Sequence, residues 1–349
     1  MQKRLTFWFL ITLVLSLGFG QLLRFEVFSI AFYAHDLLVI SLLILQFRLL
    51  TSLRLNLGIK LIFLGLFLGW LRALTMFPIA PLLIPFLYTA RLLAYLVLYL
   101  TLSKSKLKVP SKVFIYSGLV SLTIGLVQYF FLPDMRLFQY LGWDDHLFRL
   151  TLPHFDPTYS AAMLSIYLLS LSPRPSFTST FLYTLGILLS YSRSIWLSII
   201  TTGIFFLKKK KLLLLLLCLP VIILALPRKS GEGTNLLRSY SISSRFSHDL
   251  TLAKQVGWNF VIGQGYNTLP LVYQPSSDYP LHAHGFNNSF LEILSTMGIL
   301  GLLGWGLFLY RLSLHPHLRP IIIFLCVASL FNNLLLYPFT LLLVLLLAL

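Results

Sequence analysis

Long apolar runs recur along the whole of this 349-residue chain. Many hold roughly 18 to 22 residues, enough for a helix to cross the roughly 30 Å of hydrocarbon in a bilayer. With 58% hydrophobic and 11% charged residues, and a mean hydropathy of +0.86, the chain does not have the composition of a soluble globule. We therefore predict an all-α, polytopic membrane bundle that forms one integral membrane domain over residues 1–349.

The apolar runs predict about twelve transmembrane helices. Their approximate limits are residues 5–23, 30–47, 58–77, 82–102, 113–132, 158–172, 176–190, 193–207, 212–227, 287–310, 320–335 and 337–349. Around Ser190, and again around Asn332 and Pro338, one long or re-entrant segment would serve as well as two helices. Lys3 and Arg4 precede an apolar run without a convincing cleavage site, so we expect a retained first helix.

The net charge of +17 is distributed as topology would require. With the N-terminus in the cytoplasm, most of the 27 Lys and Arg residues fall on the cytoplasmic side, as the positive-inside rule predicts. All ten Asp and Glu residues map to the outer face or to an outer helix end. We therefore expect a multi-pass protein of the cytoplasmic (inner) membrane, in contact with anionic lipid and not with nucleic acid, whose acid–base chemistry lies on the external face.

Two connections are long enough to hold structure of their own, and both are expected outside the membrane. They are a short external loop over residues 133–157 and a large one over residues 228–286. A loop of the larger size is usually functional, and we expect it to carry part of an active site and a short helix over residues 243–256. The cytoplasmic connections are short and hold no GxxxxGK[ST] phosphate loop, which argues against a nucleotide-driven machine.

Three arginines lie in apolar spans or at their outer ends: Arg72, Arg91 and Arg193. On insertion scales an arginine at membrane depth costs roughly 2.5 to 3.5 kcal/mol, so it usually faces a cavity or a partner. Apart from Asp36, no intramembrane carboxylate is at hand, and guanidinium groups suit phosphate oxygens. An anionic ligand is one interpretation, and extension of the side chain to the nearby interface is the other.

The segment from His282 to Trp305 places two histidines, two asparagines and Glu292 at the mouth of an apolar helix. The stretches Asn288-Ser289-Phe290-Leu291-Glu292 and Gly298-Ile299-Leu300-Gly301-Leu302-Leu303 resemble the C-terminal signature of the O-antigen ligase and polymerase family. One position departs from that signature, because Asn287 stands where the family usually has histidine. The nearest histidines are His284 and His282.

Three further stretches extend the resemblance over most of residues 145–310. They are Ser192-Arg193-Ser194-Ile195-Trp196-Leu197; Arg149-Leu150-Thr151 followed by Phe155-Asp156-Pro157-Thr158; and Ser244-Arg245 followed by Gly263-Gln264-Gly265. Leu152 and Pro153 replace a usual glycine region, and the tryptophan usual after Arg245 is missing.

The resemblance implies a C-type membrane glycosyltransferase that takes a polyprenyl-pyrophosphate-linked glycan as donor. The acceptor would be a lipid, a glycan or a protein, and neither a nucleotide sugar, a cofactor nor an essential metal would be needed. As a hypothesis, Arg193, Arg245 and either Arg91 or Arg72 bind the pyrophosphate, and His284 or His282 activates the acceptor hydroxyl. If neither histidine is the base, either Asp156 or Glu292 takes that role or the protein is inactive.

The further residues that we expect at the substrate are Arg149, Asn288 and Glu292. For Glu292, a favourable charge at a helix N-terminus is the structural alternative. His282 and His284 lack a third clustered ligand, so we expect no metal site there.

Other classes of function stay open. A flippase for lipid-linked oligosaccharides, or another transporter, would also be polytopic with buried arginines, but its charges would run through the midplane in both halves. A purely structural envelope partner would explain neither the arginines nor the loop motif. The residues do not separate a ligase from a polymerase.

Overall fold

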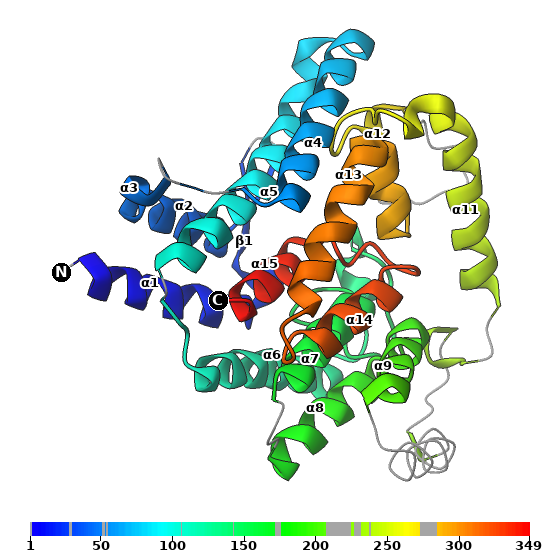
Figure 1. Ribbon diagram of the computed structural model, residues 1–349. Coiled ribbons are helices and arrows are strands. Elements are labelled where there is room, and N and C mark those ends of the chain that lie inside the picture. The colour runs from blue at the N-terminus through cyan, green and yellow to red at the C-terminus, as the bar shows by residue number, and fades with distance from the viewer. Residues whose placement is uncertain are drawn as a thin grey trace.

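The computed structural model describes residues 2–27, 30–50, 53, 55–105, 107–141, 143–171, 176–206, 225–226, 232–236, 239–272 and 285–349. Within these residues the regular structure is almost entirely helical (Figure 1), as predicted. The sheet that they contain is one antiparallel hairpin of β1 (Arg24–Val27) and β2 (Ile30–Tyr33).

Four of the described helices are long and apolar enough to cross a membrane: α4 (Leu57–Met76), α5 (Ile79–Ser105), α6 (Ser111–Phe131) and α13 (Ser289–Ser313). Five apolar helices are shorter, namely α2 (Ala34–Leu45), α8 (Phe177–Leu189), α9 (Arg193–Phe206), α14 (Arg319–Ala328) and α15 (Pro338–Leu347). The expected number of about twelve spans is therefore not confirmed. The four long apolar helices do support a helical protein embedded in a membrane.

The remaining elements are short or lie between the apolar helices. They are α1 (Gln2–Leu17), α3 (Phe47–Leu50), α7 (Pro157–Ser170), α11 (Tyr240–Val256), α12 (Leu269–Val272), and the 3-10 turns η1 (Gly20–Leu23), η2 (Arg136–Leu141), η3 (Glu232–Thr234) and η4 (Gly257–Phe260). The helix expected over residues 243–256 is confirmed as part of α11. Of the expected span 212–227, residues 212–224 and 227 lie outside the described residues.

Several predicted helix ends are wrong for local reasons. The span 30–47 begins as a helix only at Ala34, because Ile30 to Tyr33 pair with Arg24 to Val27 as a strand. The first helix ends at Leu17, and Gly20 then takes a positive φ of 52°. The span 320–335 ends as a helix at Ala328, before a turn that contains Asn332 and Asn333.

Helices α4 and α13 lie side by side (Figure 1) and approach closely through glycines. A Cβ atom added to Gly65 would lie 2.6 Å from the carbonyl oxygen of Met297, and one added to Gly304 would lie 2.6 Å from the backbone nitrogen of Ile62. Small residues at such contacts are typical of helix packing in membranes, where backbone proximity replaces the hydrophobic effect as the source of attraction.

Helix α13 is not straight, because Gly298 takes φ +68° and ψ −171°. The segment that follows η4 fills the bend: the nitrogen of Ile299 donates to the oxygen of Val261 at 3.1 Å, and the nitrogen of Gln264 donates to the oxygen of Ser295 at 3.0 Å. A Cβ atom on Gly298 would lie 2.5 Å from the backbone of Ile262. The bend therefore requires glycine, and the segment after η4 satisfies backbone groups that the bend releases.

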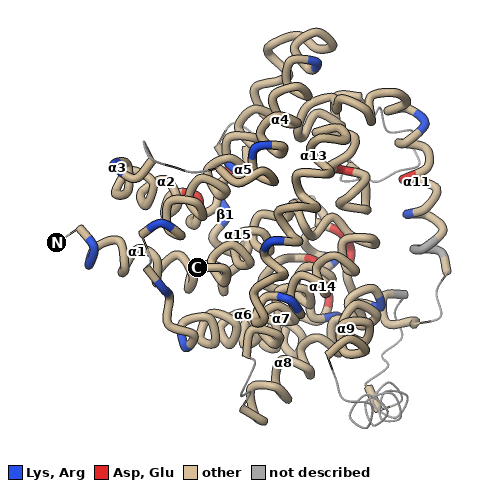
Figure 2. The backbone as a smooth tube through the Cα atoms, viewed as in Figure 1, with Lys and Arg blue, Asp and Glu red and all other residues tan. Residues whose placement is uncertain are grey.

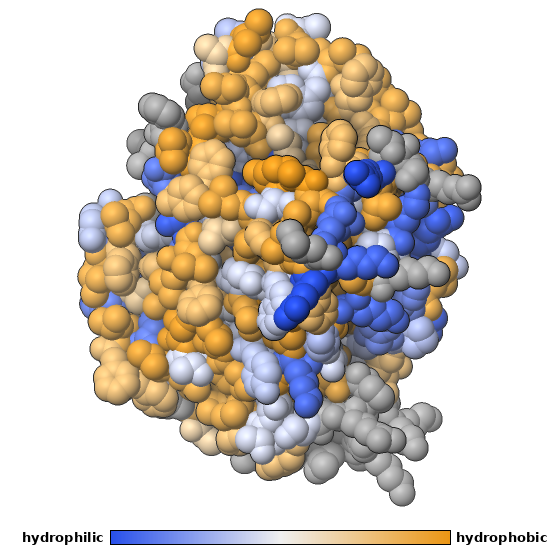
Figure 3. Space-filling model, turned by 90° about the vertical axis from the view of Figure 1, so that its left-hand side faces the viewer, coloured by the Kyte–Doolittle hydropathy of each residue, from blue (hydrophilic) through white to orange (hydrophobic). Residues whose placement is uncertain are grey.

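The core lies around α7 and α15, which are buried along most of their length. Helices α1, α5 and α7 pack against α15, and α6, α8, α9 and α14 pack against α7. Hydrophobic side chains cover most of the face shown in Figure 3, crossed by a band of hydrophilic ones. An apolar exterior around a core that contains polar groups is what a lipid-facing bundle requires.

Candidate functional site

A polar cavity of about 220 Å³ opens among these apolar helices. Its lining holds six tyrosines, one arginine, one carboxylate and two asparagines beside four apolar residues. The polar and aromatic members are Tyr33, Tyr88, Arg91, Tyr95, Tyr159, Tyr266, Asn267, Glu292, Asn333 and Tyr337. They come from β2, α5, α7, α13, the loop before α12 and the turn before α15, so only the tertiary fold brings them together.

Arg91 is anchored in the wall of this cavity. Its Nη2 lies 3.0 Å from Asp36 Oδ2 in an ion pair and donates to the carbonyl oxygen of Ala31. The guanidinium lies 5.0 Å from the ring centres of both Tyr33 and Tyr88. Its buried Nη1 has no hydrogen-bond partner among the described residues. Arg91 is therefore fixed in the cavity wall by these contacts, and its Nη1 can still donate to a ligand. Its side chain does not extend toward the membrane interface.

Asp36 is the centre of a buried network at the start of α2. It accepts hydrogen bonds from the Tyr95 hydroxyl at 2.6 Å and from the Tyr33 backbone nitrogen at 3.0 Å. His35 Nε2 lies 2.8 Å from the same Tyr95 hydroxyl. Burial raises the pKa of Tyr33 to about 12 although the neighbouring Arg91 lowers it, so this ring stays neutral and its hydroxyl can donate.

Glu292 enters the cavity from the first part of α13 and is only 6% exposed. Its Oε2 accepts a hydrogen bond from the Phe286 backbone nitrogen at 2.8 Å. Among the described residues no lysine, arginine or histidine pairs with it. Burying a carboxylate without a paired cation costs free energy, so Glu292 is a candidate functional residue.

Asn287, at the position where the family usually has histidine, ties α13 to α11. Its backbone nitrogen and its Nδ2 both donate to Asp249 Oδ1, at 2.9 and 3.1 Å. On the same helix, His248 Nε2 lies 3.0 Å from the carbonyl oxygen of Gly285. Sequence reasoning did not single out His248 or Asp249. Both lie in α11, and the prediction of a helix within the large loop was the only feature of the sequence that could have pointed to them.

Asn332 connects Arg245 to the start of α9, the helix that begins at Arg193. Arg245 Nη1 donates to Asn332 Oδ1 at 2.7 Å, and Asn332 Nδ2 donates to Ser194 Oγ at 2.9 Å. Arg193 Nη1 donates to the carbonyl oxygen of Leu236 at 2.9 Å. Asn332 thus makes the interhelical hydrogen bonds that an asparagine in an apolar segment predicts, and it also contacts one of the expected arginines.

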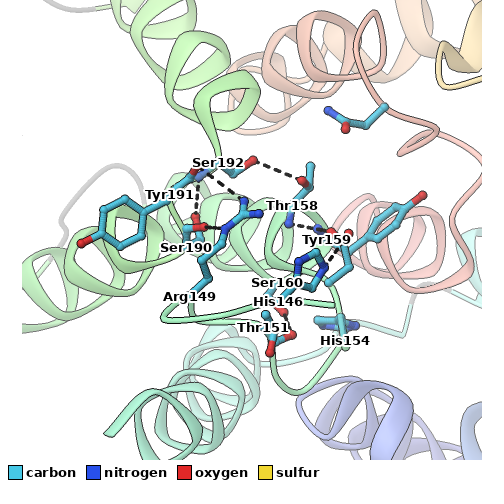
Figure 4. A network of polar contacts seen from close by, with 12 residues as sticks. His146, Arg149, Thr151, His154, Thr158, Tyr159, Ser160, Ser190, Tyr191 and Ser192 are labelled. Carbon is cyan, nitrogen blue, oxygen red and sulfur yellow. Dashed lines mark hydrogen bonds and ion pairs between the residues drawn. The ribbon is translucent and has the colours of Figure 1, made fainter. Parts of the chain in front are cut away.

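The N-termini of α7, α9 and α13 are joined by hydrogen bonds near Asn332. Asp156 caps α7 by accepting from the nitrogens of Thr158 and Tyr159, and Asn288 caps α13 in the same way. Ser192, just before α9, donates to Thr158 Oγ1 at 3.3 Å, as Figure 4 shows. Ser289 Oγ bonds to the oxygen of Asn332 at 3.2 Å. Helix N-termini carry partial positive charge, so their convergence favours an anion.

Other expected site residues have structural contacts. Arg149 is 6% exposed, and its Nε donates to the carbonyl oxygen of Ser190 at 2.8 Å, which joins the loop before α7 to the turn between α8 and α9 (Figure 4). Arg72 is half-buried on α4 and is not among the residues that line the cavity. Asn288 uses its side-chain oxygen as the helix cap. His282 and His284 lie outside the described residues.

The loop before α7 holds two histidines that sequence reasoning did not single out. His154 is fully buried, and its Nδ1 lies 3.1 Å from the Tyr337 hydroxyl. Burial lowers the pKa of His154 to about 3, although the nearby Asp156 raises it. Burial raises the pKa of Asp156, but the contacts with His146, the backbone and Arg149 outweigh it and bring that pKa to about 2. Asp156 Oδ2 lies 3.8 Å from His146 Nε2.

Asp144, His146 and Asp156, here called the loop cluster, offer ligand atoms that all lie within 4.8 Å of one another. Two carboxylates and an imidazole at this spacing would suit a divalent cation. Figure 2 draws acidic and basic segments in the same region of the view, around α14.

No protein-family model matches this chain, and no curated protein matches it.

Proposed function

We propose that this protein transfers a glycan from a polyprenyl-pyrophosphate-linked oligosaccharide to an acceptor hydroxyl. The observation that carries the proposal is the cavity in which six tyrosines surround Arg91 and Glu292 between apolar helices. Aromatic rings present apolar faces and hydroxyls to a sugar at once, and a lipid tail can remain in the bilayer beside the site. The short motifs shared with the O-antigen ligase and polymerase family point the same way.

The arginines have a clear role in such a reaction. Arg245 bonds to Asn332, and Arg193 is the first residue of α9, whose Ser194 bonds to the same asparagine. The helix N-termini near them add partial positive charge. A pyrophosphate leaving group gains negative charge as its bond to the sugar breaks, and fixed donors lower the energy of that transition state. The proposal places the site on the external face of the cytoplasmic membrane, with the N-terminus in the cytoplasm, as the charge distribution predicts.

The test is transfer in proteoliposomes supplied with a polyprenyl-pyrophosphate oligosaccharide. Arg245→Ala is compared with Arg136→Ala, a matched control that removes an exposed arginine paired with Asp134 and leaves the cavity intact. We expect transfer by the wild type and the control, and loss of roughly 10²-fold or more in Arg245→Ala, the size typical of a lost transition-state donor. Equal transfer by the two variants would refute the role of Arg245.

The products also separate the alternatives that the sequence leaves open. Longer lipid-linked glycans would identify a polymerase, and glycan on a separate lipid or protein would identify a ligase. Movement of the donor across the bilayer without any transfer would refute the proposal in favour of a flippase.

A further inference from the structure

We propose that Glu292 is the general base that takes the proton of the acceptor hydroxyl. The inference rests on the proposed glycan transfer and names the residue that acts where this chain has Asn287 in place of histidine. Glu292 is buried, lines the cavity and faces the ring of tyrosines. A general base must lie within hydrogen-bond reach of the proton that it removes, and a carboxylate in the cavity wall meets this requirement for an acceptor bound there.

The fold holds this carboxylate in one position, and one of its oxygens accepts no hydrogen bond from a described residue. The Phe286 nitrogen donates to Oε2 at 2.8 Å, whereas no described residue donates a hydrogen bond to Oε1. A Cβ atom on Gly285 would lie 2.9 Å from Oε2, so the chain approaches the carboxylate as closely as a glycine allows. Oε2 is therefore fixed by the backbone and Oε1 is available to an acceptor.

The other described carboxylates near the site are already engaged. Asp36 is held by Arg91, Tyr95 and the Tyr33 nitrogen. Asp156 caps α7, and its low pKa makes it a weak base. Asp249 accepts two hydrogen bonds from Asn287. Glu292 alone among the described carboxylates combines a place in the cavity lining with an oxygen that no described group uses.

The step balances without a further reactant. The acceptor oxygen attacks the anomeric carbon of the donor sugar while its proton passes to Glu292. The bond from that carbon to the phosphate oxygen breaks, and its electron pair leaves with the polyprenyl pyrophosphate beside the arginines. Glu292 then releases the proton to water, which restores the carboxylate.

The experiment compares Glu292→Gln with Glu26→Gln in single-turnover transfer, with donor binding measured separately. Glu26 is an exposed glutamate on β1 that does not line the cavity, so the same chemical change is made outside it. We expect Glu292→Gln to bind donor as the wild type does and to transfer about 10² to 10⁴ times more slowly, the usual contribution of a general base. Glu26→Gln should match the wild type in both measurements.

A pH profile of the single-turnover rate distinguishes a base from a structural carboxylate. The rate of the wild type should fall as the pH drops and Glu292 is protonated, which gives the profile an acidic limb. The profile of Glu292→Gln should lack this limb. The titratable groups that face Glu292 are Arg91, the tyrosines at 33, 88, 95, 159, 266 and 337, and His248 and Asp249 of α11. If Glu292→Gln does not fold, Glu292→Asp decides, since a shorter carboxylate should retain the limb at a reduced rate.

Three outcomes would overturn the proposal. Transfer by Glu292→Gln within about tenfold of the wild type excludes a general base, whose usual contribution is larger. An equal loss of donor binding and transfer makes Glu292 a binding residue instead. Loss of the pH limb in His284→Ala or His282→Ala, with the limb retained in Glu292→Gln, moves the role to that histidine. No transfer by the wild type would instead refute the proposed function itself.

Discussion

The contact between Asp36 and Arg91 gives the sharpest test of the structure. Their side chains are 9% and 10% exposed, and the guanidinium Nη2 lies 3.0 Å from Oδ2. In Asp36→Asn the amide oxygen can still accept from Tyr95, but an NH₂ group replaces Oδ2, which pairs with Arg91 and accepts from the Tyr33 nitrogen. The buried arginine would then keep its charge without a counter-ion.

Breaking a buried ion pair by removing one partner costs about 3 to 5 kcal/mol. At roughly 2 to 3 °C per kcal/mol, the midpoint of thermal unfolding should fall by on the order of 10 °C. Arg91→Gln should destabilise the protein for the converse reason, because Asp36 keeps its hydrogen bonds from Tyr95 and the Tyr33 nitrogen but loses its counter-ion. The double variant leaves neither charge unpaired, so its loss should be smaller than the sum of the single losses by more than about 1 kcal/mol.

Thermal unfolding in detergent, followed by tryptophan fluorescence, is measured for the wild type, the two single variants and the double variant. A midpoint for Asp36→Asn within about 2 °C of the wild type, on the same scale of roughly 2 to 3 °C per kcal/mol, would refute the paired, buried arrangement. Strict additivity of the two single effects would refute the contact itself, since residues in contact couple and distant ones do not.

Three further predictions follow from the packing, the buried histidine and the loop cluster. Gly304→Ala should destabilise by about 1 to 3 kcal/mol in thermal unfolding because its Cβ meets the Ile62 backbone, whereas Gly306→Ala, with nothing within 4 Å, should be neutral or slightly stabilising; equal effects would contradict the α4–α13 contact. His154 has a folded pKa of about 3, below its unfolded value, so its neutral form is favoured by folding and stability is lost as the pH falls below about 6.5. Between pH 7 and pH 5 this amounts to about 2 kcal/mol, and His154→Gln should show a correspondingly shallower loss of unfolding midpoint; an unchanged pH dependence would exclude a buried neutral imidazole. EDTA should leave glycan transfer unchanged, and a loss restored by Mg²⁺ or Mn²⁺ would instead assign the loop cluster a cation.

Local signals predicted the helices of the middle of the chain well. The expected spans 158–172, 176–190 and 193–207 correspond to α7, α8 and α9 within about two residues at each end, the usual disagreement between ways of assigning helix ends. Asp156 followed by Pro157 is a start signal that can be read without any tertiary contact, because the cap bonds lie within three residues. The same holds for Asn288 at the start of α13.

The sequence also pointed to Arg91, Arg193 and Glu292, since charge in an apolar segment is costly wherever the segment packs. Arg245 was singled out only by the resemblance of its loop motif. It did not distinguish their surroundings. Arg149 was expected at the substrate, yet its donors meet backbone carbonyls of the turn between α8 and α9. Whether an arginine meets a carbonyl, a carboxylate or an open cavity depends on segments far away in the chain.

Apolar composition and helix signals thus determined that the chain is helical, suited to a membrane, and charged at a few positions. Tertiary structure alone decided the bend at Gly298, the β1–β2 hairpin and the cavity. Each of these depends on contacts between residues far apart or on a backbone conformation that a neighbouring segment stabilises, as the segment after η4 does for α13. Helical periodicity reports which side of a segment is apolar, but it carries no information about which other segment that side will meet.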